Sequence, residues 1–186
     1  MLEPSDSQES LEFSKIAFQL SEEYHTPILV RTCTRIAHSQ SIVNTGERVE
    51  VPQKEYVKDP LRVMMTTNSM KAHYRVEERT KAMTAFAETT ELNRMEMGED
   101  TTLGIITSST SYQYVREVFG EKASVLKLGL SWPMPVEKIK EFASKVDKVL
   151  VIEELEPIIE NHCRQIGVEG TGKEIIPLVD ELTQGR

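Results

Sequence analysis

The sequence predicts an α/β fold in which residues 101–186 form a parallel-sheet unit of three layers. Four short runs in this part of the chain are apolar along their whole length, so neither face of the corresponding strand is expected to meet water. These runs are residues 103–107, 124–130, 148–152 and 173–178. The segments between the runs supply the second observation, because their apolar residues recur at helical spacing.

The connecting segments carry apolar residues three and four positions apart, which is typical of a helix with one apolar stripe. The stripes are Val115, Val118 and Phe119, then Val136, Ile139, Phe142, Ala143 and Val146, then Leu155, Ile158, Ile159, Cys163 and Ile166. Strands that alternate with helices are usually parallel and joined by right-handed crossovers. The sequence therefore predicts helices on both faces of the sheet.

Composition excludes several classes of protein. The 186 residues carry a formal net charge of -8, which disfavours a general nucleic-acid surface and favours a soluble cytoplasmic protein. No apolar run approaches the ~18 residues needed to span a bilayer, so no membrane contact is expected. Cys33 and Cys163 stand far apart without a CxxC pattern, so we expect reduced thiols and no four-cysteine iron-sulfur cluster held by this chain alone.

The first 43 residues predict a helix followed by one buried strand. Asp6 and Glu9 have the spacing of a reciprocal helix cap, and the apolar stripe that follows is Phe13, Ile16, Ala17, Leu20 and Tyr24. Residues 28–33 follow a proline and are expected to be the strand. No partner strand precedes them, which predicts a chain cut from a larger α/β domain; the alternative is that helix and strand dock on the C-terminal sheet.

The loop after this strand holds the first candidate site residues. Arg35, His38 and Ser39 follow the carboxyl end of a predicted strand, which is where α/β proteins usually place ligand contacts. An arginine at such a position suits a substrate that bears a carboxylate. The alternative is a polar turn in which serine and histidine cap a helix or face water.

Residues 44–100 are expected to connect two domains. Residues 44–48 predict a turn, Val49 and Val51 a short strand, and residues 69–91 a helix that wraps a neighbour or fills a junction. Residues 98–100 mark the boundary before the sheet unit.

Residues 167–173 have the spacing of a phosphate-binding loop but do not fit its chemistry. Glu174 stands where a hydroxyl is needed for magnesium, and the loop follows a predicted helix instead of opening one. A helix-to-strand turn in which Gly167 ends the helix explains the pattern.

Three further motifs follow predicted strands. The hydroxyls of residues 108–111 could bind an anion at a helix start or simply cap that helix. Residues 152–156 place three carboxylates where they could take protons, bind a cation or form a solvated helix start. The stiff aromatic loop 132–135 suits contact with another domain or subunit.

Seven segments together resemble the alpha subunits of indolepyruvate:ferredoxin oxidoreductases, in the 2-oxoacid:ferredoxin oxidoreductase family. They are residues 2–9, 31–39, 92–94, 103–108, 112–115, 125–130 and 151–154, in the family's order. The resemblance implies a segment of a thiamine diphosphate enzyme that oxidatively decarboxylates aryl pyruvates, forms an acyl-CoA and passes electrons through iron-sulfur clusters to ferredoxin. One departure is Ser109, which stands where the family usually has glycine.

The resemblance also implies a division of the chain. Residues 1–43 would end the pyrimidine-binding domain, residues 44–100 would be an interdomain linker with a helix, and residues 101–186 would be a transketolase C-terminal-like domain. Thiamine diphosphate, magnesium and the clusters would be bound outside this segment, which is expected not to turn over alone. Its partners would be the rest of the alpha subunit, the beta subunit, ferredoxin, a 2-oxoacid and CoA. The alternative from another class is a non-catalytic α/β module that binds a partner or an anion.

Overall fold

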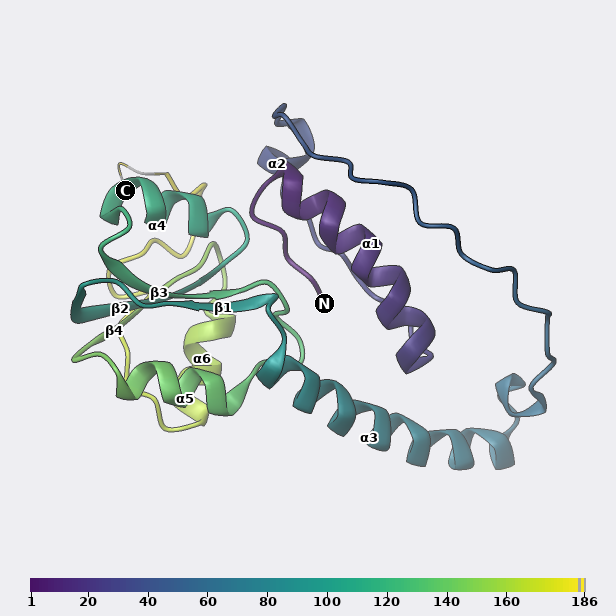
Figure 1. Cartoon of the computed structure of the whole chain (residues 1–186). Coiled ribbons are helices and arrows are strands. Elements are labelled where there is room, and N and C mark those ends of the chain that lie inside the picture. Colours follow the sequence, from purple (N-terminus) through teal and green to yellow (C-terminus); the bar gives the residue numbers. More distant parts are fainter. Residues whose placement is uncertain (184, 186) are drawn as a thin grey trace.

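The computed structural model describes residues 1–183 and 185, and its centre is a sheet of four strands (Figure 1). The strands are β1 (Asn93–Glu96), β2 (Asp100–Ser108), β3 (Ala123–Leu128) and β4 (Val149–Ile152), in the order β1-β3-β2-β4. Strand β2 is parallel to both β3 and β4, whereas β1 pairs with β3 in the antiparallel sense. The sheet is therefore mixed and mostly parallel, and the α/β class is confirmed.

Helices cover both faces of the sheet, as predicted (Figure 1). Helix α4 (Ser111–Phe119) lies on one face, and α5 (Val136–Ser144) and α6 (Ile158–Gln165) lie on the other. Neighbouring residues of β2 point to opposite faces, so Ile105 packs in the cluster with α4 and Ile106 in the cluster with α5 and α6. Both isoleucines are fully buried, which explains why the strand is apolar along its length.

The prediction of a fourth parallel strand at residues 173–178 is wrong. Among the described residues after α6, Thr171 alone bridges to β4, through Leu150, and the chain then turns as the amides of Ile175 and Ile176 both donate to the Gly172 carbonyl. Pro177 follows and has no amide to offer a sheet. The fourth strand is β1, which was not predicted.

The prediction of a buried strand at residues 28–33 is also wrong. Val30 makes a single parallel bridge to Leu2, and Leu29 is 61% exposed. Leu2 also bridges to Leu130 just beyond β3. The N-terminal segment thus lies between residues 29–31 and the end of the sheet, so the alternative in which this region docks on the C-terminal unit is what the structure shows.

Helix α1 (Ser7–Tyr24) begins at the predicted cap, with one difference. The Asp6 side chain accepts a hydrogen bond from the Glu9 amide at 2.8 Å, but the Glu9 carboxylate accepts from the Ser5 amide, also at 2.8 Å, instead of returning to Asp6. The predicted stripe packs inward, with three members buried (Phe13, Ala17 and Leu20) and Ile16 and Tyr24 half-buried. Hydrophobic packing with Leu2, Leu92 and Leu130 fixes α1 beside the sheet.

A long connection joins α1 to the sheet unit. After α2 (Thr34–His38), residues 40–59, here called the strap, run extended to η1 (Pro60–Arg62) and α3 (Thr66–Thr89). Val49 and Val51 are about 80% exposed and form no strand, contrary to prediction. Within the described residues, no backbone-to-backbone hydrogen bond involves residues 46–58.

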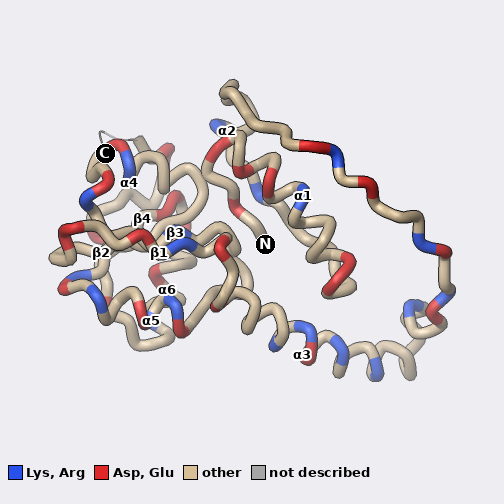
Figure 2. Tube along the Cα trace, viewed as in Figure 1, with Lys and Arg blue, Asp and Glu red and all other residues tan. Residues whose placement is uncertain are grey.

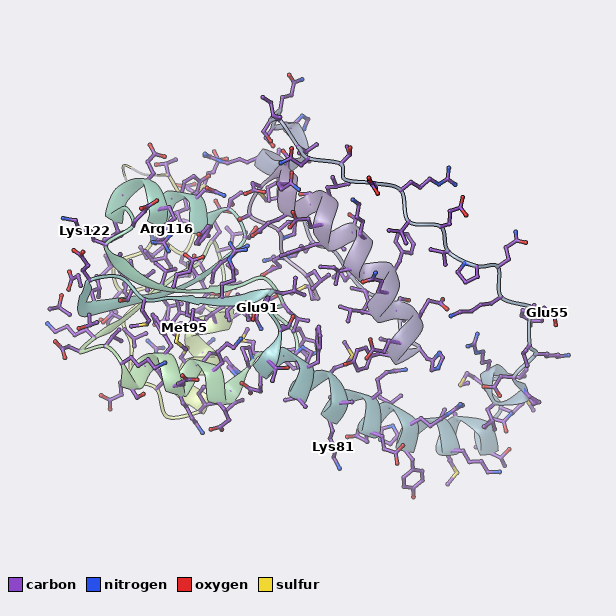
Figure 3. All side chains as sticks on the ribbon, viewed as in Figure 1. Glu55, Lys81, Glu91, Met95, Arg116 and Lys122 are labelled. Carbon is purple, nitrogen blue, oxygen red and sulfur yellow. The ribbon has the colours of Figure 1, made fainter. Side chains whose placement is uncertain are left out.

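The strap and α3 carry charges of both signs and extend away from the sheet (Figure 2). Glu55 on the strap and Lys81 on α3 lie far from the sheet unit (Figure 3). Ala87 is the buried residue of α3, near its end, where Phe86 packs beside Tyr24 with ring centroids 6.1 Å apart. Among the described residues, no helix combines the length and apolar character needed to cross a lipid bilayer.

Candidate functional site

A cavity of about 470 Å³ lies at the carboxyl ends of the parallel strands. Ser108 ends β2, Ser131 follows β3 and Glu153 follows β4, and all three line this cavity. Loops at this edge of a parallel sheet are the usual ligand-binding position in α/β proteins. The opposite wall comes from the N-terminal region, with Glu3 and residues 31–33. The cavity therefore needs both the N-terminal region and the sheet unit.

The hydroxyl loop, residues 108–111, forms one side of the cavity. Thr110 precedes α4 without a capping hydrogen bond from its side chain, and its Oγ1 lies 3.6 Å from the Cys33 thiol. Ser109 has φ 51°, in the left-handed region that glycine adopts without strain. The position where the family resemblance expected glycine is thus one where a serine side chain carries a conformational cost.

The acidic turn after β4 forms a second side. The Glu153 carboxylate accepts hydrogen bonds from the amides of Ile159 and Glu160, each at 2.9 Å, and so caps α6. Burial raises the pKa of Glu153, and the two capping bonds oppose that shift only in part. Leu155 also lies in the left-handed region, at φ 58°. Glu153 is therefore a buried helix cap, and the solvated helix start considered from the sequence does not describe it.

An ion pair and a serine hydroxyl on the cavity walls were not predicted. Arg31, which lines the cavity with its side chain 61% exposed, forms an ion pair with the almost fully buried Glu3 carboxylate. The Ser131 hydroxyl is buried and has no hydrogen-bond partner among the described residues. Sequence spacing could not have identified these residues, because Glu3, Arg31 and Ser131 line one cavity only in the tertiary fold. Trp132, the next residue, is 62% exposed beside the cavity wall.

The predicted rim residues lie on α2, beside the cavity instead of in it. Arg35 stacks over the Tyr114 ring, 5.3 Å from its centroid, and its Nε donates to Glu181 at 2.6 Å. That hydrogen bond raises the pKa of Arg35. His38 is exposed, and the Ser39 hydroxyl lies 3.1 Å from that of Ser7. The structure places Arg35 and His38 on one short helix and Ser39 directly after it, and their role in a rim stays a prediction.

Residues 167–173 are not arranged as a phosphate-binding loop. Gly167 has φ 80° and follows α6, which confirms it as the helix stop. The Lys173 amide donates to Glu160 at 2.9 Å, and its ammonium group donates to the Glu153 carbonyl at 2.6 Å. Both donors that phosphate would need are used within the chain.

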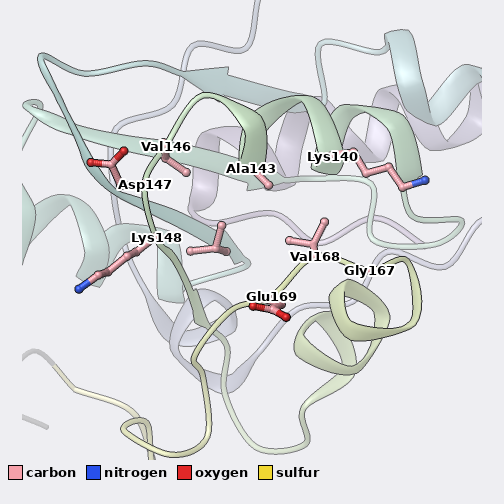
Figure 4. Close-up of a pocket in the computed structure, with 9 residues that line it drawn as sticks. Lys140, Ala143, Val146, Asp147, Lys148, Gly167, Val168 and Glu169 are labelled. Carbon is pink, nitrogen blue, oxygen red and sulfur yellow. The ribbon is translucent and has the colours of Figure 1, made fainter.

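A second, shallower cavity of about 400 Å³ lies at the amino end of β4 (Figure 4). Its lining carries charges of both signs, from Lys140, Lys148, Asp147 and Glu169, and includes the apolar side chains of Val146 and Val168. Among residues 1–183 and 185, no three His, Cys, Asp or Glu side chains are grouped to hold a metal ion.

Comparisons with known proteins match the chain to part of longer ones. It is 40% identical over 179 residues to the indolepyruvate oxidoreductase subunit IorA of Methanothermobacter thermautotrophicus, covering 93% of this chain and 29% of that protein. IorA of Thermococcus kodakarensis is 32% identical over 203 residues, covering 100% of this chain and 31% of that protein. The chain thus spans less than a third of the length of these curated relatives.

Two further comparisons complete the picture. A solved structure from Magnetococcus marinus, 2-oxoglutarate:ferredoxin oxidoreductase with 2-oxoglutarate, coenzyme A and succinyl-CoA bound, aligns with a TM-score of 0.47 and 20% identity, over 82% of this chain and 26% of that one. No protein-family model matches the sequence.

Proposed function

Because the chain is homologous to about 30% of the IorA subunit, in the 2-oxoacid:ferredoxin oxidoreductase family, we propose that it supplies scaffold and active-site rim to an enzyme of this kind. The reaction proposed for the whole enzyme is oxidative decarboxylation of an aryl pyruvate such as indolepyruvate. The acyl group would pass to CoA and the electrons to ferredoxin. The segment alone is expected not to turn over.

One observation carries this proposal: identity of 30% or more to IorA proteins of several archaea extends over nearly all of this chain. The cavity supports it independently, because it lies where ligands of parallel α/β sheets bind. The two strained residues that line it, Ser109 and Leu155, add support, since such conformations gather at functional sites.

The proposal keeps the domain division expected from the sequence. Residues 1–43 would end the pyrimidine-binding domain, residues 44–100 would connect, and residues 101–186 would be the transketolase C-terminal-like domain. The described residues include two cysteines, Cys33 and Cys163, of which the second is buried, and no group of three His, Cys, Asp or Glu side chains, so they do not fit an iron-sulfur cluster or a metal ion. Magnesium and the clusters would be held by other parts of the enzyme, and so would thiamine diphosphate, as the family resemblance implies.

Arg35, His38 and Ser39 remain the proposed rim. Arg35 is the best candidate to bind a substrate carboxylate, because Glu181 already supplies a carboxylate to its guanidinium across an exposed, displaceable contact. In the assembled oxidoreductase, Arg35→Ala should raise KM for an aryl pyruvate by about tenfold or more, the loss of one charge-assisted hydrogen bond.

The experiment measures ferredoxin reduction by the assembled enzyme with Arg35→Ala and His38→Ala. Matched controls are Arg48→Ala on the strap and His73→Ala on α3, both exposed and remote from the cavity. Unchanged rates and KM for both rim variants would remove the rim assignment. Failure of any assembled form to reduce ferredoxin with an aryl pyruvate would remove the proposed reaction instead.

The alternative, a free-standing α/β module that binds a partner or an anion, is separated from the enzyme proposal by the adjoining coding sequence. A GDG-type diphosphate motif and clustered cysteines encoded in the same reading frame would favour the enzyme. Their absence there would favour the module.

A further inference from the structure

A lysine that is completely buried occupies β3. The side chain of Lys127 is 0% exposed, and its ammonium group forms an ion pair with Glu9 of α1, whose side chain is 8% exposed. The Lys127 Nζ atom lies 5.4 Å from the centroid of the Phe13 ring and 5.3 Å from that of the Tyr112 ring. These rings leave little room for water to solvate the ammonium group in place of the carboxylate. The cost of desolvating two charges offsets much of their attraction, so a gain in stability alone does not explain why this ion pair is buried.

The Glu9 carboxylate also holds the backbone of the N-terminal segment. Its Oε2 atom, the one paired with Lys127, accepts hydrogen bonds from the Ser5 amide at 2.8 Å and the Ser5 hydroxyl at 2.9 Å. Two residues earlier, Glu3 lines the cavity, and its amide donates to the Gly129 carbonyl at 2.8 Å. A direct path of contacts therefore runs from the buried ammonium group to the cavity wall.

The wall formed by this segment fixes its neighbour in turn. The Arg31 amide donates to the Leu2 carbonyl at 2.8 Å, and the Arg31 side chain pairs with Glu3. Cys33, two residues further, lines the same cavity. Movement of residues 2–5 would consequently release residues 31–33.

We infer that Lys127 and Glu9 are positioning residues, whose buried ion pair holds residues 2–5 and 31–33 in place as one wall of the cavity. The role is the same whichever reaction the cavity serves. It is a role of placement, because neither side chain lines the cavity itself.

Arg94 does not duplicate this function. Its Nη1 donates to the other carboxylate oxygen, Oε1 of Glu9, at 2.9 Å, and its Nε donates to Glu96 at 3.1 Å. Arg116 on α4 also pairs with Glu96. These contacts join α1 to β1 and α4, whereas the oxygen that binds Ser5 is the one paired with Lys127.

The two cysteines allow a direct test in the full chain. Cys33 is half-buried in the cavity wall, whereas Cys163 is buried in the core and burial raises the pKa of Cys163 to about 12. Only a thiolate reacts with a disulfide reagent, so Cys163 stays inert while the core is intact. The rate at which DTNB modifies Cys33 therefore reports on the wall, and Cys163 reports on global opening.

The variant is the apolar pair Glu9→Met with Lys127→Met, which removes both charges at similar volume. We expect far-UV circular dichroism to be retained and Cys33 modification to accelerate about tenfold or more, as expected for the loss of a hydrogen bond to a charged group. Cys163 should remain unmodified. Hydrogen exchange should quicken at the amides of Glu3 and Ser5 but not at Ile105.

The matched control is Glu141→Met with Lys145→Met, which removes an exposed ion pair. Glu141 lies on α5 and Lys145 directly after it, and the Lys145 Nζ atom is 2.6 Å from the Glu141 Oε1 atom. This control should leave both cysteine rates unchanged. An unchanged Cys33 rate in the buried-pair variant would overturn the inference, and so would equal acceleration of both cysteines, which would mean general destabilisation. If the double variant does not fold, Lys127→Met alone is tested, because Glu9 keeps its bond to Arg94 while the oxygen that binds Ser5 loses its ammonium partner. Cys33 modification should again accelerate while Cys163 stays unmodified, and an unchanged Cys33 rate would overturn the inference.

Discussion

Replacing Glu9 by glutamine should destabilise the chain more than replacing Lys127 by methionine. In Glu9→Gln the Lys127 ammonium stays fully buried without a counter-charge, and the guanidinium of Arg94 remains nearby. Leaving one charge of a buried pair uncompensated costs about 3–5 kcal/mol. In Lys127→Met the carboxylate keeps Arg94 at 2.9 Å and the Ser5 amide at 2.8 Å, so about 1–3 kcal/mol should be lost.

These losses are measurable because a domain of this size is stable by only about 5–15 kcal/mol. The assay is urea unfolding at pH 7 followed by far-UV circular dichroism, with the slope of each transition checked for constancy. The double variant Glu9→Gln with Lys127→Met should recover most of the loss caused by Glu9→Gln, since no unpaired ammonium remains. Equal losses in the two single variants, or a double variant no better than Glu9→Gln, would refute the reasoning.

Three further predictions follow from packing and protonation. Gly129→Ala should lower the free energy of unfolding by about 1–3 kcal/mol in urea, because its Cβ would overlap the Leu92 carbonyl oxygen and lie 2.8 Å from Phe13; a neutral result would show that the backbone can move there. Phe142→Ala should lose about 3–5 kcal/mol, since the ring is fully buried between α5 and the sheet; a loss below 1 kcal/mol would contradict this packing. Burial by itself would raise the pKa of Glu9, but Lys127 and the Ser5 bonds outweigh it and hold the pKa below the usual 4.5. The resulting stability is complete above pH 4.5 and is lost as the pH falls through the lowered value, so acid titration of unfolding should be flatter in the Glu9→Met, Lys127→Met variant.

The strands that sequence reasoning located are those buried on both faces. Residues 103–107 and 148–152 match β2 and β4 closely, because the apolar pattern and the burial have the same cause. Strand β1 was missed since it begins with Asn93, a polar residue that is 1% exposed. Its amide side chain accepts from Leu130 and donates to Ala87, partners that only the tertiary fold supplies.

The candidate site, like the sheet, was predicted from the sequence only in part. The hydroxyl loop and the acidic turn were singled out from the sequence because each follows a strand, and the structure places both on the cavity. The wall formed by Glu3 and Arg31 was not, because residues 28–33 were interpreted as a buried strand. That interpretation used only the local apolar character of residues 28–33. In the structure Val30 makes a single bridge, to Leu2, and no strand forms there.

The strap has a consequence for how the molecule could be divided. Cleavage anywhere in residues 46–58 would sever one covalent connection without breaking a backbone-to-backbone hydrogen bond, whereas α1 stays attached through its apolar face and Lys127. The two halves should therefore behave as a split protein: after a single protease nick they should co-elute, and when produced separately they should reassemble on mixing. The covalent connection through the strap would then not be required for the two halves to fold together.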